Sequence, residues 1–287
     1  MMRCLYSDRR IIRFLYTLFD RRRLVLGGAI VAVMIFVGIA APLLAPADET
    51  DTDLMSAWAP PSHDHPMGAD KLGRDIASRL VFGARVSLIV TTFVLAITFV
   101  IGVTTGMLAG YHGGWIDTLL MRAVDIVLAF PELIFAILVT AMLGAGMSSV
   151  IIALSLAWWP GIARLTRSLV LSLREEAYLD AAIACGTPVG AILLRHVLPN
   201  IVPALIVRAS LGVGFIVTAE ATLSFLGIGV QEPTPSWGGM IRDGLEGLRT
   251  APYLALFASV ALGVTILGFN LLGDGLRDVL DPRLRDT

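Results

Sequence analysis

Side chains that do chemistry in enzymes are sparse in this 287-residue sequence, and they show no catalytic spacing. A phosphate-binding loop needs a lysine followed by serine or threonine, but the single lysine, Lys71, is followed by Leu72. The closest histidine pair, His63 and His65, fits a solvated loop better than a metal site. Serine, histidine and cysteine show no arrangement typical of a nucleophilic triad. The sequence therefore predicts a protein that is not an enzyme and that carries no catalytic residue, metal or cofactor of its own.

Three carboxylates lie inside otherwise apolar stretches, where an ionised group usually faces protein or a watery path. Asp125 follows Arg122 by three residues, which favours a local ion pair over a role in transport. Glu132 follows Pro131, a residue that loosens a helix, so pathway lining and subunit contact both stay open. Glu220 lies near the end of its apolar stretch, where it can reach water or a facing loop. All three carboxylates are thus candidate pathway or subunit-contact residues.

The composition places these side chains in a lipid bilayer. Apolar residues make up 56% and charged residues 16% of the chain, against about 45–50% and about 25% in soluble domains, and the mean hydropathy is +0.80. The net charge of −1 excludes a nucleic-acid binder, and two isolated cysteines give no disulfide framework. The predicted fold class is an all-α, multi-pass membrane protein.

Six predominantly apolar runs of about 20 residues are long enough to cross a hydrocarbon core of about 30 Å. The first is followed by Ala45-Pro46-Ala47, a possible cleavage site, but the run exceeds the roughly 7–15 residues of a cleaved signal and favours a retained helix. Small residues at 144–149 divide the third run from the fourth. In the fourth, Trp158-Trp159-Pro160 favours a kink with packed rings over a binding cage. The predicted spans are 24–45, 86–110, 118–143, 149–168, 201–223 and 252–273.

Arginine positions orient the spans, because cytoplasmic flanks carry the excess of positive charge. Seven of the 22 basic residues precede the first span, which places the N-terminus in the cytoplasm, and six spans return the C-terminus to the same side. The predicted organisation is a cytoplasmic segment 1–23, the first transmembrane helix 24–45, an external segment 46–85, a five-helix core 86–275 with a cytoplasmic loop 172–200, and a cytoplasmic tail 276–287.

The cytoplasmic loop carries the most specific pattern in the sequence. Its Ala-rich run with acids at the start predicts one short helix, and Gly186 followed by Pro188 predicts the end of that helix and the start of a second. The small side chains of Ala181 and Ala182 would let another protein approach closely. A competing interpretation is an amphipathic loop that lies on lipid headgroups.

This segment resembles the Glu-Ala-Ala loop in the permease subunits of bacterial ABC importers. That loop has an acidic-Ala-Ala triplet, a glycine and a final Leu-Pro pair; here Asp180 replaces the glutamate and His196 an aliphatic residue. The acidic charge is kept, so the resemblance implies that the loop docks on an ATPase. The residues that the resemblance assigns to coupling are Asp180, Ala181, Ala182, Gly186, Leu198 and Pro199.

Three further stretches resemble the C-type subunits of the dipeptide, oligopeptide and nickel branch of this family, namely 65–88, 224–238 and 269–283. In the first, Asp70 with Arg74 and Asp75 with Arg79 are each four residues apart, so each pair can meet on a helix face. The external-loop residues that the resemblance singles out are Asp70, Arg74, Asp75 and Trp237.

The resemblance implies the six-helix fold of type I ABC importer permeases in a bacterial inner membrane. Besides lipid, it implies as partners a second, homologous permease subunit, two cytoplasmic ATPase subunits that hold ATP and magnesium, and an external solute-binding protein. Di- or oligopeptides are the expected solutes, with nickel, glutathione or another small solute as alternatives. A secondary transporter or a purely structural membrane subunit would leave the cytoplasmic loop unexplained.

Overall fold

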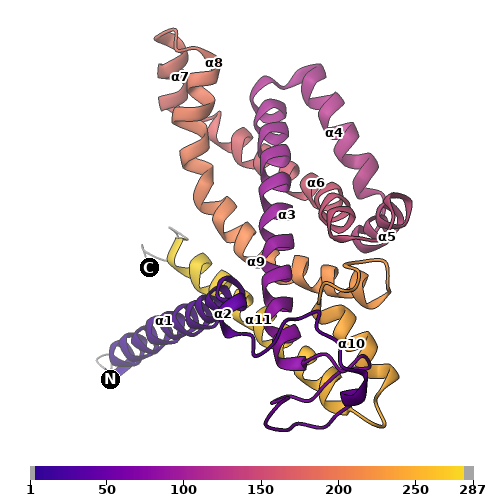
Figure 1. The fold of residues 1–287 in the computed structure, drawn as a ribbon. Helices are drawn as coiled ribbons and strands as arrows, with labels where there is room; N and C mark the ends of the chain where they lie inside the picture. The colour runs from indigo at the N-terminus through magenta and orange to yellow at the C-terminus, as the bar shows by residue number, and fades with distance from the viewer. Residues whose placement is uncertain (1–3, 281–287) are drawn as a thin grey trace.

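The computed structural model describes residues 4–280, with side chains from 22 to 279, and the long elements in this part of the chain are helices (Figure 1). Five of them are long and apolar enough to cross a membrane. The predicted all-α, multi-pass fold is confirmed. The five helices are α1 (Cys4–Ile39, with its apolar part from Arg22), α3 (Ile76–His112), α6 (Met147–Leu173), α9 (Leu198–Phe225) and α11 (Pro252–Leu280).

The continuous helix predicted over 118–143 is wrong. This stretch forms two helices, α4 (Gly114–Leu128) and α5 (Glu132–Leu143), which are bent by 86° relative to each other. Pro131 has no N–H to donate and disfavours helical angles at Phe130, so the helix ends and restarts there. Counted as one broken span, the two helices bring the number of candidate membrane spans to six.

Other boundaries also differ from the predicted ones. α1 ends at Ile39, and a separate short helix, α2 (Ala41–Leu44), completes the predicted first span. α3 already begins at Ile76, so the end of the predicted external segment is helical, and the rest of that segment contains one short helical turn, η1 (Leu54–Ser56). The division before α6 is confirmed, because Gly144 takes a φ of +87° that ends α5.

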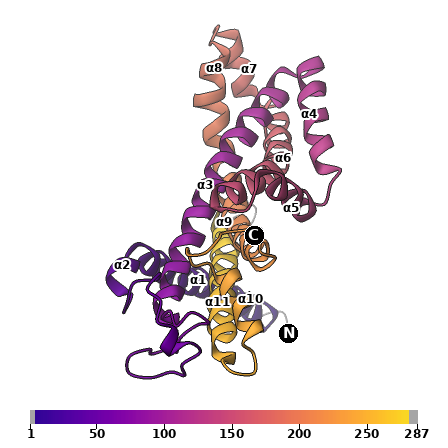
Figure 2. The same ribbon diagram turned by 45° about the vertical axis from the view of Figure 1, so that its right-hand side comes forward.

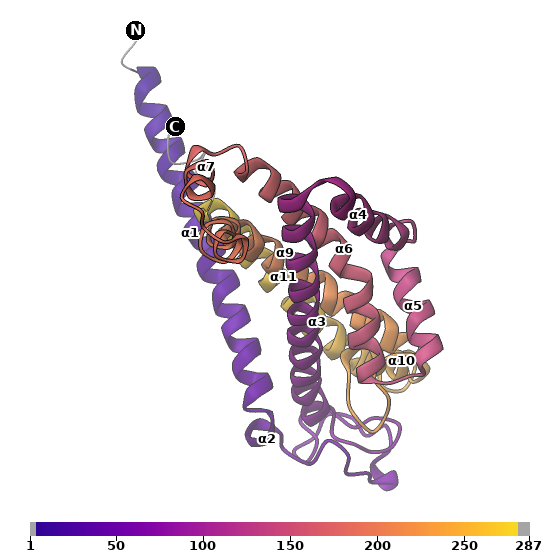
Figure 3. The same cartoon turned by 90° about the horizontal axis from the view of Figure 1, so that it is seen from above.

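The helix ends sort to two sides of the molecule, as the predicted topology requires. Figure 3 shows the start of α1, the end of α11 and the short helix α7 (Ala177–Ala184) at one edge, which is the cytoplasmic side of that topology. α2 and the segment before α3 lie at the opposite, external edge. Figure 2 shows α7 and α10 (Trp237–Glu246) far apart in the molecule. The predicted tail beyond Leu280 and the side chains before Arg22 lie outside the described residues.

Close packing of α3 on α6 forms the centre of the molecule. Gly102, Gly106 and Gly110 recur every four residues along α3, and each of them faces α6. A Cβ added at Gly106 would lie 2.5 Å from the carbonyl oxygen of Ala163. Small residues at this spacing let two membrane helices approach closely, so α3 and α6 pack as one unit.

Apolar clusters fill the spaces between the helices in the described part of the chain. One lies between α3, α5, α6 and α9 and contains Leu154 and Trp158. A second, which contains Met34 and Leu254, joins α1 and α11 to α3, α9 and α10. A third holds the cytoplasmic ends together around Leu193. Both the external segments and the cytoplasmic loop are therefore attached to well-packed helices.

Candidate functional site

The cytoplasmic loop folds into two short helices that project from the bundle, α7 and α8 (Val189–Ala191) (Figure 1). We call residues 177–191 the tip. The side chains of Asp180 and Ala181 are exposed, and that of Ala182 is half-buried. This acidic and small-residue surface is accessible to a partner protein on the cytoplasmic side.

Large apolar side chains are exposed beside that surface. Tyr178 is 41% and Ile183 54% exposed, although the predicted topology places both in water rather than in lipid. Clustered exposed apolar groups on a soluble surface mark sites where another protein binds. The tip therefore has the surface chemistry of a protein-docking site.

Gly186 ends α7 as the sequence predicts. Its φ of +73° is left-handed, and the N–H groups of Gly186 and Thr187 donate to the carbonyls of Ile183 (2.9 Å) and Ala182 (3.1 Å). These two bonds form a Schellman cap, whose left-handed position favours glycine over residues with a Cβ. Pro188 then precedes α8 and opens it. The predicted order of helix, break and helix is confirmed.

A single buried side chain fastens α7 to the bundle. Leu179 is 2% exposed and belongs to the cytoplasmic cluster, together with Val170, Leu193 and Val197. On the other side of the tip, a π-helical segment, η2 (Ile192–Val197), leads directly into α9. The tip is therefore attached to the transmembrane helices both through this core contact and through a continuous helical connection.

Pro199 accounts for the wide turns of η2. Leu198 and Pro199 begin α9, and Pro199 has no N–H to donate to the carbonyl of Arg195. The chain widens to π-helical turns just before it, which is a common response to a missing helical bond. The predicted coupling residues thus fall in two places, with Asp180, Ala181, Ala182 and Gly186 in the tip and Leu198 and Pro199 at the root of α9.

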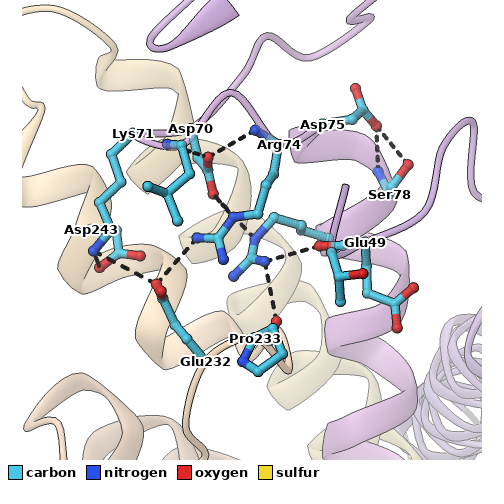
Figure 4. Close-up of polar contacts among 12 residues, drawn as sticks. Glu49, Asp70, Lys71, Arg74, Asp75, Ser78, Glu232, Pro233 and Asp243 are labelled. Carbon is cyan, nitrogen blue, oxygen red and sulfur yellow. Dashed lines mark hydrogen bonds and ion pairs between the residues drawn. The ribbon is translucent and has the colours of Figure 1, made fainter. Parts of the chain in front are cut away.

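On the external side, Asp70 is the centre of a buried ion cluster (Figure 4). Its Oδ2 lies 2.7 Å from Nε of Arg74 and 3.4 Å from Nε of Arg79, and all three side chains are buried. Its Oδ1 accepts hydrogen bonds from the N–H groups of Leu72 (2.8 Å) and Arg74 (3.0 Å). One carboxylate thus lies between two buried guanidinium groups, an arrangement that is strongly destabilised when that carboxylate is removed.

The predicted pairing of Asp75 with Arg79 is wrong. Asp75 caps α3 instead, because its Oδ2 accepts hydrogen bonds from the N–H (2.7 Å) and the Oγ (2.8 Å) of Ser78. Arg79 pairs with Asp70 instead. The predicted pairing of Asp70 with Arg74 is confirmed, but it lies in the loop before α3 rather than on a helix face.

The arginines of this cluster tie three external segments together. Arg79 Nη1 donates to the carbonyls of Glu49 (3.1 Å) and Pro233 (3.3 Å), one before α3 and one after α9. Arg74 Nη2 lies 3.2 Å from Oε1 of Glu232 (Figure 4). The external segment is consequently fixed to the loop that precedes α10.

Lys71 extends the cluster to α10 itself. Burial disfavours the charged form of Lys71 and so lowers its pKa. The hydrogen bond from Nζ to Oδ1 of Asp243 (3.0 Å) outweighs this effect, and the pKa of Lys71 is raised overall. Burial also works against ionised Glu232, but the hydrogen bond and charge of Arg74 lower the pKa of Glu232 below its usual value. At Asp243 burial dominates and raises the pKa of the carboxyl.

Trp237 completes this external scaffold. It begins α10, is 3% exposed and donates a hydrogen bond from Nε1 to the carbonyl of Leu80 (3.0 Å). Its ring fills the space at Gly83, where an added Cβ would lie 2.7 Å from Cδ1. The four predicted external residues, Asp70, Arg74, Asp75 and Trp237, are therefore structural contacts between α3, α10 and the connecting loops.

Comparison with known proteins decides the family. Residues 102–286 match the family of binding-protein-dependent transport system inner membrane components. The chain belongs to this family. It is 42% identical over 261 residues to the dipeptide transport system permease protein DppC of Alkalihalophilus pseudofirmus, which covers 91% of this chain and 86% of that protein.

Two glutathione permeases are equally similar to this transport component. It is 41% identical over 262 residues to the glutathione transport system permease protein GsiD of Pectobacterium atrosepticum, covering 91% of this chain and 87% of the relative. It is 42% identical over 269 residues to GsiD of Escherichia coli, covering 93% of this chain and 89% of the relative. The predicted ABC permease identity and the inner-membrane location are confirmed, and the chain is a transport subunit rather than an enzyme. A secondary transporter is excluded.

Glu220 of this permease lies inside the helix packing, so its predicted access to water is wrong. Its side chain is 1% exposed and accepts hydrogen bonds from Ser224 of the same helix (2.9 Å) and from Ser87 of α3 (3.3 Å). The hydroxyl of Ser224 in turn accepts from the N–H of Val230 (3.1 Å). Glu220 thus joins α3, α9 and the external turn after α9.

Asp125 pairs with Arg164 of α6 at 2.7 Å, so the predicted pair with Arg122 is wrong. A second pair, Asp117 with Arg167, makes two bonds of 2.5 Å between the same two helices. These ion pairs line a cavity of about 360 Å³ between α4 and α6. We call it the inner cavity. It lies near the cytoplasmic ends of both helices in the predicted topology.

The remaining candidate, Glu132, is half-buried at the start of α5, where the chain breaks completely rather than loosening. Its role stays a prediction. Sequence reasoning missed Glu232 and Asp243, the partners of Arg74 and Lys71. They lie 158 and 172 positions away along the chain, so no local spacing signals either contact.

Proposed function

We propose that this chain is the C-type permease subunit of an ATP-driven importer and that its solutes are di- or oligopeptides. The observation that carries the proposal is the tip, an exposed helix with an acidic-Ala-Ala surface that is capped at Gly186 and rooted in a transmembrane helix. The dipeptide permease relative supports the peptide class. Glutathione, itself a small peptide with free carboxylates, is the second candidate because of the two glutathione permease relatives.

The function requires partners on three faces of this chain. A second, similar permease subunit would lie against it, so that the solute crosses between the two. Two cytoplasmic ATPase subunits would hold ATP and magnesium, and one of them would receive α7 in a surface cleft. A solute-binding protein would deliver the solute to the external scaffold, whose ion cluster keeps the receiving surface rigid.

Coupling would follow from the rigidity of the helix behind the tip. The stretch Val189–Phe225 is helical over 37 residues, about 55 Å at 1.5 Å per residue, and crosses the membrane. When the ATPase pair closes on ATP, a push on the tip would therefore tilt this helix along its whole length. Rocking of packed helices in this way alternates access between the two sides of the membrane.

Two tip variants test this proposal in the assembled transporter. Ala181→Trp puts a ring on the exposed docking surface, and Gly186→Val forces a branched side chain onto a φ of +73°. Each should lower ATP-dependent uptake of a dipeptide about tenfold or more, while the subunit stays in the membrane with its second permease subunit. An effect of this size corresponds to about 1.4 kcal/mol of lost coupling.

Gly190→Ala is the matched control. Gly190 is an exposed glycine of the same tip, has open space around it and takes no positive φ, so the added methyl group should leave uptake within about twofold of the wild type. Wild-type uptake in both Ala181→Trp and Gly186→Val would overturn the assignment of the tip.

A further inference from the structure

Arg208 is a cation near the middle of a transmembrane helix. It lies ten residues after the start of α9 and seventeen before its end, so it is about 15 Å from the nearer helix terminus. Its side chain is half-buried in this chain. A charged side chain at this depth is too costly to face lipid, and such groups face protein or a watery cavity and mark solute routes.

The guanidinium of Arg208 is held against α6. Its Cζ lies 5.1 Å from the centre of the Trp158 ring, a cation–π contact, and that ring also stacks on Phe215 at 5.0 Å. One turn along α6, Gly161 has no side chain, and a Cβ there would lie 3.9 Å from Nη2 of Arg208. The aromatic ring and the glycine thus fix the position of the cation and leave space beside it.

Both donors at this position lack an acceptor. No carboxylate oxygen of the described residues lies within 4 Å of the Arg208 guanidinium. The indole N–H of Trp158, a side chain that is 5% exposed, has no hydrogen-bond partner there either. Buried polar groups in native proteins are nearly always paired, so the buried indole N–H without an acceptor, together with the half-buried guanidinium beside it, points to an anionic acceptor from outside this chain.

Exposed polar residues of α6 lie on the cytoplasmic side of Arg208. Gly161, Arg164 and Ser168 share one face of α6 at helical spacing, and the last two are exposed. Arg164 also lines the inner cavity. A solute that leaves Arg208 toward the cytoplasm therefore meets the ion-paired cavity within about one helical turn of Gly161.

We infer that Arg208, positioned by Trp158 and Gly161, binds the carboxylate of the transported solute as it crosses the middle of the membrane. This inference rests on the proposed function and deepens it. A carboxylate that leaves water at this depth loses its hydration, and a guanidinium replaces it with charge-assisted hydrogen bonds. A positively charged residue at this point repels a free metal cation, so the site selects solutes with a carboxylate over nickel.

The test compares Arg208→Gln and Arg208→Lys in proteoliposomes that contain the whole transporter with its ATPases and binding protein. The probe is radiolabelled dialanine. Arg208→Gln should lower the maximal uptake rate about tenfold, because the amide keeps donors but loses the charge. Arg208→Lys should stay within about threefold of the wild type, and the affinity of the binding protein for dialanine should be unchanged in every preparation.

Arg85→Gln is the matched control, since Arg85 is an exposed arginine near the external end of a transmembrane helix, where its side chain can reach the interface. It should change uptake less than about twofold.

Three results would overturn the inference. Wild-type uptake by Arg208→Gln would do so while leaving the peptide proposal intact. Loss of the second permease subunit on purification of Arg208→Gln would show that Arg208 pairs with a carboxylate of that subunit instead. A wild-type transporter that takes up Ni²⁺ but neither dialanine nor glutathione would overturn the inference and the peptide proposal together.

Discussion

Asp70 faces Arg74 and Arg79 at a site from which water is excluded. The three residues are 1%, 2% and 3% exposed, respectively. Asp70→Asn keeps the shape of the side chain and removes its charge, which leaves buried Arg79 without an ion-pair partner and buried Arg74 with Glu232 alone. We expect a loss of about 3–5 kcal/mol in the stability of the purified transporter, seen as a lower melting temperature.

Asp75→Asn is the comparison for that variant. Asp75 is as buried as Asp70, but it caps a helix, and asparagine caps nearly as well as aspartate. Asp75→Asn should lower the stability of the purified transporter by less than about 1 kcal/mol. Equal losses in the two variants would contradict the central place of Asp70 in the cluster.

Glu232 gives the external cluster a dependence on pH. The pKa of Glu232 is lowered in the folded state. Its ion pairs therefore stabilise the fold fully at any pH above the unfolded-state pKa of about 4.3, and this stabilisation is lost as the pH falls through the folded-state pKa. Glu232→Gln should lower the melting temperature slightly at pH 7. The effect should be worth less than about 1 kcal/mol, because over a third of the side chain meets water, which screens the pair.

The measurement is a pH series of melting curves for the wild type and Glu232→Gln. The two curves should converge as the pH falls from the unfolded value of about 4.3 through the lowered pKa of folded Glu232, because the carboxyl of the wild type becomes protonated there. A difference that widens in acid would show that Glu232 is stabilised by something other than Arg74 and Lys71.

At the scale of elements, the contact of α3 with α6 depends on glycine. Gly106→Val should force the helices apart, since even a Cβ would meet the backbone of Ala163 at 2.5 Å. We expect a cost of at least about 2–3 kcal/mol and a sharp fall in the yield of folded protein, measured by size-exclusion chromatography in detergent.

Gly263→Val provides the control for that substitution. Gly263 also lies inside a transmembrane helix, α11, but a Cβ there meets nothing within 4 Å. Its yield should match the wild type. A normal yield for Gly106→Val would contradict the tight packing of α3 on α6.

The elements also show how far sequence reasoning reaches. Long apolar runs and arginine positions predict the helices and their direction, because burial in lipid and charge placement act locally along the chain. The cap at Gly186 is local too and is predicted correctly. The break at Pro131 is signalled by the proline, but the size of the bend, 86°, is not indicated by the local sequence.

Contacts between distant segments are beyond that reach. Arg79 pairs with Asp70 rather than with Asp75, because Asp75 accepts hydrogen bonds from the N–H and hydroxyl of Ser78 and the loop places Asp70 beside Arg79. Glu220 is buried because Ser87 of another helix meets it. The four-residue spacing of Gly102, Gly106 and Gly110 is visible in the sequence, and it is the signal that could have paired α3 with α6.

At the scale of the whole molecule, the helices pack as two groups. One consists of α3 with α4, α5 and α6, and the other of α1, α9, α10 and α11. Glu220 and Ser87 bridge the groups within the membrane, and the ion cluster around Asp70 bridges them outside. α1 precedes the matched family region in the sequence. It packs with the second group, because Gly268 and Gly275 let it approach α11 closely. The tip connects the two groups, because it follows α6 of the first, leads through η2 into α9 of the second, and packs through Leu179 on Val170 of α6. Under the proposed function, a push on it would move one group against the other.

The central claim is that this chain conducts solute only as part of an ATP-driven assembly. The direct measurement is dialanine uptake into proteoliposomes that hold either the complete transporter or this chain alone. We expect uptake by the complete transporter to require ATP and the binding protein, and to be absent with this chain alone. Rapid uptake by the chain alone, with or without an ion gradient, would contradict the account.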